Sequence, residues 1–172
     1  MGRRGHRLGL EMFVVGLLLL PVSLWAEEVE TGVLKGTFQG RAYSIVVPYG
    51  YKGKAEEKKW PLIVGLHWHH GSGSELLGYF KNHLLYGSAI MACPDGIDES
   101  WTDEDEPFIL ALVDSLKKEY EVDPERVFLL GVSAGAHLTY HVGLRHPELF
   151  RGIAVIAGAL TASRQRWGTP LF

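Results

Sequence analysis

Nearly unbroken apolar runs alternate with amphipathic segments along most of this chain. Across residues 106–120 apolar side chains recur at every fourth position, as at Phe108, Leu112 and Leu116, which predicts a helix with one buried face. The apolar runs are too continuous for half-exposed strands and are typical of strands buried on both faces of a parallel sheet. These runs span residues 61–67, 88–94, 126–131 and 151–158.

Two further helices and two leading strands complete the predicted order. The helices are expected over residues 74–86 and 133–145, and the strands over residues 33–39 and 42–48, with a tight turn at Gly40. Alternation of this kind predicts an α/β domain, with a mostly parallel sheet, right-handed crossovers and helices on both faces.

The ends of the predicted strands indicate where chemistry should lie. In open α/β sheets, ligands bind beyond the carboxyl ends of the strands. Here those ends fall at His67, Pro94 and Gly131, so we expect the functional residues in the loops that follow these three positions.

The first 26 residues have the pattern of a secretory signal peptide. Three arginines precede the nine-residue apolar run Met12–Leu20, and cleavage is expected after Ala26. The run is shorter than the ~20 residues needed to cross a bilayer, although an uncleaved anchor is the alternative. This pattern predicts a secreted or periplasmic domain over residues 27–172, with no membrane contact after cleavage.

Composition narrows the functional classes. The 172 residues are 47% hydrophobic and 22% charged, which fits one globular domain. The formal net charge is −3, and loss of the basic leader would make it more negative, so a nucleic-acid partner is not expected. Cys93 is the only cysteine, which excludes a disulfide framework, and its apolar surroundings predict a small buried side chain.

The segment Gly131-Val132-Ser133-Ala134-Gly135 carries the candidate chemistry. A strand that turns sharply into a helix exposes the central serine in a strained conformation, and flanking glycines let neighbouring backbone pass close by. The free N–H groups at the start of the helix would stabilise a developing negative oxygen. Ser133 is therefore the candidate nucleophile. The alternative is a glycine-rich turn in which Ser133 only caps the helix.

The surrounding sequence resembles a known group of enzymes. Residues 120–127 match the phrase Y-x-V-D-x-x-R-V, and residues 146–150 match H-P-x-L-F. Together with the glycine–serine motif, these phrases are similar to exported α/β-hydrolase esterases, above all polyhydroxybutyrate depolymerases and feruloyl esterases. The resemblance covers roughly residues 40–160. It implies hydrolysis of a small-molecule or polymeric carboxylic ester by a serine enzyme without a cofactor.

The resemblance also implies two backbone donors that bind the oxyanion. One is the N–H of Ala134, and the second comes from the loop after the third strand, where the group has L-H-G-x-G-G. Here Trp68 follows His67 in place of glycine, so Trp68 and His69 are the candidates for the second donor. An insertion that makes His70-Gly71 the counterpart is the alternative. The side chains of His67, His70 and Trp101 are expected to line the substrate cleft.

The histidine and the acid that would complete a catalytic triad are not found where the resemblance implies them. Their order should be serine, then Asp or Glu, then His. The histidines after Ser133 are His137, His141 and His146, which lie in or at the end of the predicted helix and are interpreted as packing or solvated residues. Residues 159–172 contain no His, Asp or Glu. The expectation is a partial hydrolase, truncated after about six strands, with little turnover.

Three other interpretations were weighed. The run His67-Trp68-His69-His70 suggests a metal site, but the H-x-H-x-D-H pattern would need Asp and His at positions occupied by Gly71 and Ser72, so no metal is expected. The acidic residues 103–106 lack calcium-loop spacing and predict a solvated start of a helix. The alternative function is a non-catalytic relic, or a polymer- or carbohydrate-binding module, on the same fold.

Overall fold

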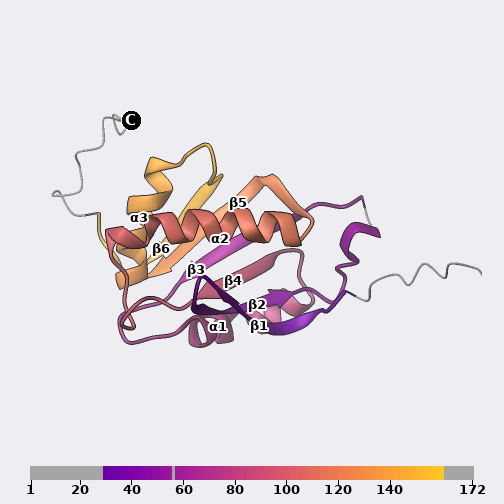
Figure 1. The fold of residues 1–172 in the computed structure, drawn as a ribbon, viewed down its shortest axis with the longest axis horizontal. Helices are drawn as coiled ribbons and strands as arrows, with labels where there is room; N and C mark the ends of the chain where they lie inside the picture. Colours follow the sequence, from indigo (N-terminus) through magenta and orange to yellow (C-terminus); the bar gives the residue numbers. More distant parts are fainter. Residues whose placement is uncertain (1–28, 56, 161–172) are drawn as a thin grey trace, which may run out of the picture.

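The computed structural model describes residues 29–55 and 57–160, which form a six-stranded sheet with helices on both faces (Figure 1). The strand order is β1-β2-β4-β3-β5-β6. The strands are β1 Gly32–Phe38, β2 Arg41–Val47, β3 Trp60–Leu66, β4 Ile90–Pro94, β5 Val122–Val132 and β6 Gly152–Ile156. The α-helices are α1 Gly73–Leu85, α2 Glu106–Glu119 and α3 Ala134–Arg145, with short 3-10 turns at Gly53–Ala55 and Asp103–Asp105. The predicted signal peptide lies outside the described residues.

The pairing confirms the predicted mixture of a leading hairpin and a parallel sheet. Strands β1 and β2 pair antiparallel, and β2 joins the sheet by antiparallel pairing with β4. The pairs β3–β4, β3–β5 and β5–β6 are parallel. Leu66 and Gly131 are register partners, so β3 and β5 deliver their following loops to the same edge of the sheet.

Each face of the sheet is covered by a different set of helices. Helices α2 and α3 pack on one face, in a core that joins residues such as Leu112 and Leu138 to Leu62, Val64 and Leu129 of the sheet. In Figure 1, α2 lies across the strands on this face. Helix α1 packs on the other face, where Leu76 and Leu77 join a smaller cluster. The continuous apolar strands thus bury both faces, as predicted.

Strand β5 begins earlier than the predicted apolar run at 126–131. It extends back to Val122 and includes Pro124, which cannot donate a ladder hydrogen bond. The pairing with β3 shifts register between Trp60 and Leu62, so the proline lies beside an irregularity that tolerates it. The early start of β5 therefore includes a locally irregular segment that the apolar pattern does not predict.

Candidate active site

Ser133 occupies a sharp turn between β5 and α3. Its backbone angles are φ 52° and ψ −110°, outside the regions that non-glycine residues normally adopt. Although Ser133 stands at the N-cap of α3, its side chain makes no capping hydrogen bond. Within the described chain its hydroxyl is not hydrogen-bonded to another side chain, so the helix-capping interpretation of this serine does not fit the geometry.

The two glycines of the motif are required by close approach of other groups. A Cβ on Gly131 would lie 2.2 Å from the Thr139 hydroxyl oxygen and 2.3 Å from the Gly135 carbonyl oxygen. A Cβ on Gly135 would lie 2.2 Å from the carbonyl oxygen of Leu66. Real Cβ atoms do not approach oxygen this closely, so the turn is built for glycine at both positions.

Backbone hydrogen bonds hold the turn on three sides. The Ser133 N–H donates to the Ile156 carbonyl at 2.9 Å, and the Gly135 N–H donates to the His67 carbonyl at 3.1 Å. The Ser133 carbonyl accepts from the N–H of Ala136 at 3.0 Å. No acceptor for the Ala134 N–H occurs among residues 29–55 and 57–160. As the first N–H of α3 it can donate to an anion that forms beside Ser133.

The loop after β3 corrects two of the sequence-based expectations. His67 is completely buried: its Nε2 accepts from the Gly96 N–H at 3.0 Å, and its Nδ1 lies 2.7 Å from the Trp68 carbonyl oxygen. Trp101 is buried as well, and its indole N–H donates to the His67 carbonyl at 2.9 Å. Neither side chain lines an open cleft. Their polar atoms are used to fix the loops at the carboxyl edge of the sheet.

Trp68, His69 and His70 lie on the outer part of this loop. Trp68 stands where the related esterases have glycine, but it does not have a positive φ; that conformation falls on His70, whose φ is 58°. The His70 side chain is exposed, and its Nδ1 lies 2.9 Å from a carboxylate oxygen of Glu99. The glycine of the related motif is thus replaced without strain at position 68.

An apolar cavity of about 370 Å³ adjoins the turn. Val132 immediately precedes Ser133, and Ile156 provides the carbonyl that accepts from Ser133. Three aromatic residues, Trp68, Tyr79 and Phe80, contribute to the wall, and the rings of Trp68 and Tyr79 meet edge to face with centroids 6.0 Å apart. The complete lining is Trp68, Leu76, Tyr79, Phe80, Val132 and Ile156. The cavity therefore offers an apolar group a place close to the serine.

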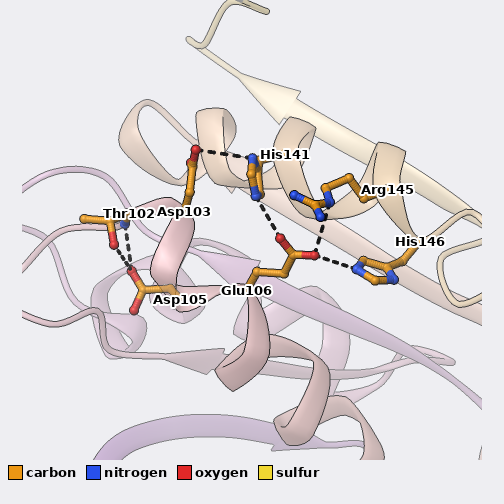
Figure 2. Close-up of polar contacts among 7 residues, drawn as sticks. All are labelled: Thr102, Asp103, Asp105, Glu106, His141, Arg145 and His146. Atoms are coloured by element: carbon orange, nitrogen blue, oxygen red, sulfur yellow. Dashed lines mark hydrogen bonds and ion pairs between the residues drawn. The ribbon is translucent and has the colours of Figure 1, made fainter. Parts of the chain in front are cut away.

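The acidic run at the start of α2 is solvated only in part, because Asp103 and Glu104 are exposed, whereas Asp105 is buried and Glu106 is half-buried. Figure 2 shows the Glu106 carboxylate among side chains of α3: His141 Nε2 lies at 2.8 Å and Arg145 Nε at 3.4 Å. His146 Nε2 lies 2.7 Å from Oε1, the oxygen that Arg145 also approaches, whereas His141 contacts Oε2. Burial raises the pKa of Glu106, but hydrogen bonds from His146 and His141 lower it, so that the net pKa lies below its usual value.

The preceding carboxylate, that of Asp105, is buried and forms an ion pair with a residue distant in sequence. It accepts from the Thr102 N–H at 2.7 Å and forms an ion pair with Arg41 of β2 at 2.6 Å. The sequence could not reveal these partners, because Glu106 lies 35 residues from His141 and Asp105 lies 64 residues from Arg41. Only the packing of α3 beside α2 brings the first pair together.

Two searches of the described residues gave no candidates. Histidines, cysteines and carboxylates do not gather in any group of three or more that could hold a metal ion there. Nor is any helix in this part of the chain long and apolar enough to cross a bilayer.

Comparison with known proteins shows which proteins this chain resembles. Residues 95–170 match the model of the Prolyl oligopeptidase family. Feruloyl esterase C of Emericella nidulans is 28% identical over 142 residues, which cover 77% of this chain and 52% of that protein. Poly(3-hydroxyalkanoate) depolymerase C of Paucimonas lemoignei is 42% identical over 50 residues, or 29% of this chain and 12% of that protein. The chain thus spans about half the length of the curated relatives that it matches first.

Solved structures show the same fold. A thermostable esterase superposes with a TM-score of 0.63 at 21% identity, covering 77% of this chain and 42% of its own. Acetyl xylan esterase from Aspergillus awamori superposes with a TM-score of 0.61 at 19% identity, covering 78% and 56%. These structural neighbours confirm the predicted α/β-hydrolase fold class. The curated relatives that the chain resembles include named esterases.

Proposed function

We propose that this chain, which has the α/β-hydrolase fold and is related to its esterase group, provides the nucleophile and oxyanion site for hydrolysis of a carboxylic ester. The observation that carries the proposal is the conformation of Ser133. A non-glycine residue with φ 52°, between two sterically required glycines and at the start of α3, is the geometry that exposes a nucleophilic hydroxyl.

The proposed reaction proceeds through an acyl-enzyme. The Ser133 oxygen attacks the ester carbonyl carbon, and a general base takes the hydroxyl proton. The carbonyl oxygen becomes an oxyanion, which accepts hydrogen bonds from the Ala134 N–H and from an N–H of the loop after β3. Collapse of this intermediate expels the alcohol, which takes up the proton, and water then releases the acid. The base is a further requirement, because Ser133 has no side-chain hydrogen-bond partner in the described part of the chain.

The substrate is proposed to be an ester with an apolar acyl or alcohol group, either a small molecule or a polymer. The cavity next to Ser133 is lined by apolar and aromatic side chains, which suits such a group and gives an ionic one no partner. The relatives include proteins named as feruloyl esterase, acetylxylan esterase and poly(3-hydroxyalkanoate) depolymerase. Esters of aromatic acids, acetylated xylan and polyhydroxyalkanoate are therefore the substrates to compare.

A fluorophosphonate probe tests the nucleophile. The probe phosphonylates a nucleophilic serine. Because no base for Ser133 occurs in the described part of the chain, the wild-type chain should be labelled slowly, and Ser133→Ala should not be labelled at all. Mass spectrometry of the labelled peptide should place the adduct on Ser133. Labelling that persists in Ser133→Ala, or an adduct on another serine, would contradict the proposal.

The second candidate function is a non-catalytic module that binds polymer through the same cavity. Its distinguishing result is retention on insoluble xylan or polyhydroxyalkanoate with no labelling of Ser133. Replacing Trp68 by alanine removes one of the aromatic side chains that line the cavity and should then weaken retention. Replacing Tyr86, an exposed aromatic residue outside the cavity, by alanine should leave retention unchanged.

Export is proposed on the basis of the first 26 residues, whose pattern is that of a cleaved leader. The expressed protein should then be recovered outside the cytoplasm, with Glu27 at its N-terminus. N-terminal sequencing of the recovered chain tests both points, and an intact leader on cytoplasmic protein would contradict them.

A further inference from the structure

The buried ring of His67 uses both of its nitrogens, and their roles are fixed by their partners. Nε2 lies 3.0 Å from the backbone nitrogen of Gly96, which can only donate. Nε2 is therefore the acceptor, and the single proton of the neutral ring resides on Nδ1. Nδ1 in turn lies 2.7 Å from the carbonyl oxygen of Trp68, to which it donates. The tautomer thus follows from one backbone N–H in the loop after β4.

The bond from His67 orients the peptide unit that joins Trp68 to His69. The Trp68 carbonyl accepts from His67 and also from the Gly71 N–H at 3.0 Å, so two donors hold its direction. In a trans peptide, the following N–H points opposite to the carbonyl. The His69 N–H is therefore directed away from the buried imidazole, and no acceptor for it occurs in the described segments.

We propose that His67 is a positioning residue, which turns the Trp68–His69 peptide so that the His69 N–H serves as the second oxyanion donor. This inference rests on the proposed function and assigns the second donor role to one of the two candidates that the sequence left open. Its basis is that the Trp68 carbonyl is held toward the His67 ring, which leaves the next N–H, that of His69, for a ligand.

The same residue also connects this peptide to the nucleophile. The carbonyl of His67 accepts from the Gly135 N–H at 3.1 Å, and Gly135 lies two positions after Ser133. The Trp101 indole N–H donates to that carbonyl as well, at 2.9 Å. His67 is therefore hydrogen-bonded through its ring to the loop after β3, which carries the His69 N–H, and through its backbone carbonyl to the turn that contains Ser133. A shift of the ring would change the distance between His69 N–H and Ser133.

Two substitutions test the two hydrogen bonds of the His67 ring one at a time. In His67→Asn, the amide nitrogen can take the place of Nδ1 and donate to the Trp68 carbonyl, while the Gly96 N–H loses its acceptor. In His67→Gln, the amide oxygen can take the place of Nε2 and accept from Gly96, while the Trp68 carbonyl loses its donor. Each leaves one buried polar group without its bond, so both should destabilise the chain to a similar extent.

The rate of Ser133 phosphonylation by the fluorophosphonate probe is the functional readout. We expect His67→Asn to stay within a few-fold of wild type, and His67→Gln to fall at least about tenfold, toward the ~100-fold typical of losing one oxyanion donor. Exposed His83→Gln, in the last turn of α1, is the control for the chemical change and should react at the wild-type rate. Equal losses in the Asn and Gln variants, in proportion to lost stability, would overturn the positioning role.

A spectroscopic measurement keeps the inference testable apart from the nucleophile. Nitrogen-15 NMR of histidine-labelled wild-type protein should show one ring protonated at Nδ1 and bare at Nε2, with a proton that exchanges slowly because the ring is buried. Loss of this signal in His67→Asn identifies it. If the probe labels nothing, the nucleophile proposal fails, whereas a ring protonated at Nε2 overturns the His67 inference even when Ser133 is labelled.

Discussion

Ser133 holds a backbone conformation that costs an L-residue about 1–3 kcal/mol, so the surrounding bonds must impose it. Its N–H is bonded to Ile156, and its carbonyl to the N–H of Ala136. Two residues later, Gly135 is bonded to His67. The hydroxyl of Ser133 makes no capping hydrogen bond, so it does not contribute to the stability of this turn.

Replacing Ser133 by glycine should therefore make the chain more stable and unreactive. Glycine adopts positive φ without strain, so the thermal midpoint should rise by the equivalent of about 1 kcal/mol. Ser133→Ala is the matched control: it also removes the hydroxyl, but its Cβ keeps the strain, and its midpoint should stay near that of wild type. Calorimetry of the three proteins checks this order. A glycine variant no more stable than the alanine variant would show that the turn is unstrained.

Gly135 should be among the least tolerant positions of the chain. A Cβ atom at position 135 would lie 2.2 Å from the carbonyl oxygen of Leu66. Because that oxygen belongs to the backbone, the clash can be relieved only by moving α3 away from β3. We expect Gly135→Ala to lower the free energy of unfolding by about 2 kcal/mol or more.

Gly78→Ala provides the opposite case in the same protein. A Cβ at Gly78, within α1, meets nothing within 4 Å, and alanine is the better helix former by roughly 1 kcal/mol. Urea denaturation should therefore show loss of stability at position 135 and a gain at position 78. Similar effects at both positions would mean that close approach is not what selects glycine in the serine turn.

Individual side chains were only partly predictable from the sequence. The glycine–serine pattern located the turn because steric demands of a β–α reversal are local. His67 and Trp101 were assigned to a cleft because polar and aromatic residues at strand ends often contact ligands. The structure buries both, since the carbonyl and ring of His67 find partners in Gly96, Trp101 and Gly135. Gly96 and Trp101 lie in the segment after β4, and Gly135 lies in the first turn of α3, so no local sequence pattern relates them to His67.

Helix α3 is attached to α2 through one carboxylate. The Glu106 carboxylate is contacted by the side chains of His141, Arg145 and His146, which all belong to α3 or its C-cap. Glu106 lies in the first turn of α2, where negative charge is favoured. Because α3 starts at Ala134, this contact fixes the far part of the helix whose first residues form the serine turn. The carboxylate therefore contributes to the position of the whole helix.

The contribution of Glu106 should disappear in acid. Its pKa in the folded chain lies below the ordinary 4.5, because the lowering by His146 and His141 outweighs the raising by burial. A carboxyl group with a depressed folded pKa stabilises the fold above its unfolded pKa. That stabilisation is lost as pH falls from about 4.5 through the lower folded value.

The test compares urea midpoints at pH 7 and at pH 3.5. Glu106→Gln should lower the free energy of unfolding at pH 7 by about 1–3 kcal/mol, and the difference from wild type should shrink at pH 3.5. Glu104→Gln makes the same change on an exposed neighbour and should alter neither value by more than ~0.5 kcal/mol. A pH-independent cost of the Glu106 substitution would show that packing, not the ion pairs, carries its effect.

Segment boundaries were predicted far better than the contacts between segments. The strong periodicity of 106–120 gave α2 to within a residue, and the apolar runs gave β3, β4 and β6 because strands buried on both faces need few polar positions. The acidic start of α2 was predicted to be solvated, which holds for Asp103 and Glu104 but not for Asp105 and Glu106. Its charge pattern is the same whether the carboxylates face water or, as here, Arg41 and the histidines of α3.

The whole sheet is sandwiched between two apolar clusters, and Cys93 of β4 belongs to the one beneath α1. Its side chain is fully buried, and burial raises the pKa of the thiol far above its normal range. A thiol reagent can reach Cys93 only when α1 separates from the sheet or the domain unfolds. Because Cys93 is the only cysteine, its reactivity reports on the opening of the folded unit as a whole.

Native protein should therefore react with a disulfide reagent at least about 1,000-fold more slowly than protein in denaturant, as expected for a stability of about 5 kcal/mol or more. The control is a Cys93→Ala chain with Tyr86→Cys, which places the thiol at a side chain that is 83% exposed. It should react at nearly the same rate with and without denaturant. If Cys93 reacted natively as fast as the control, α1 would not stay packed on β4. The turn that holds Ser133 would then lack the rigid sheet on which its strained geometry depends, because β5 and β4 both pair with β3.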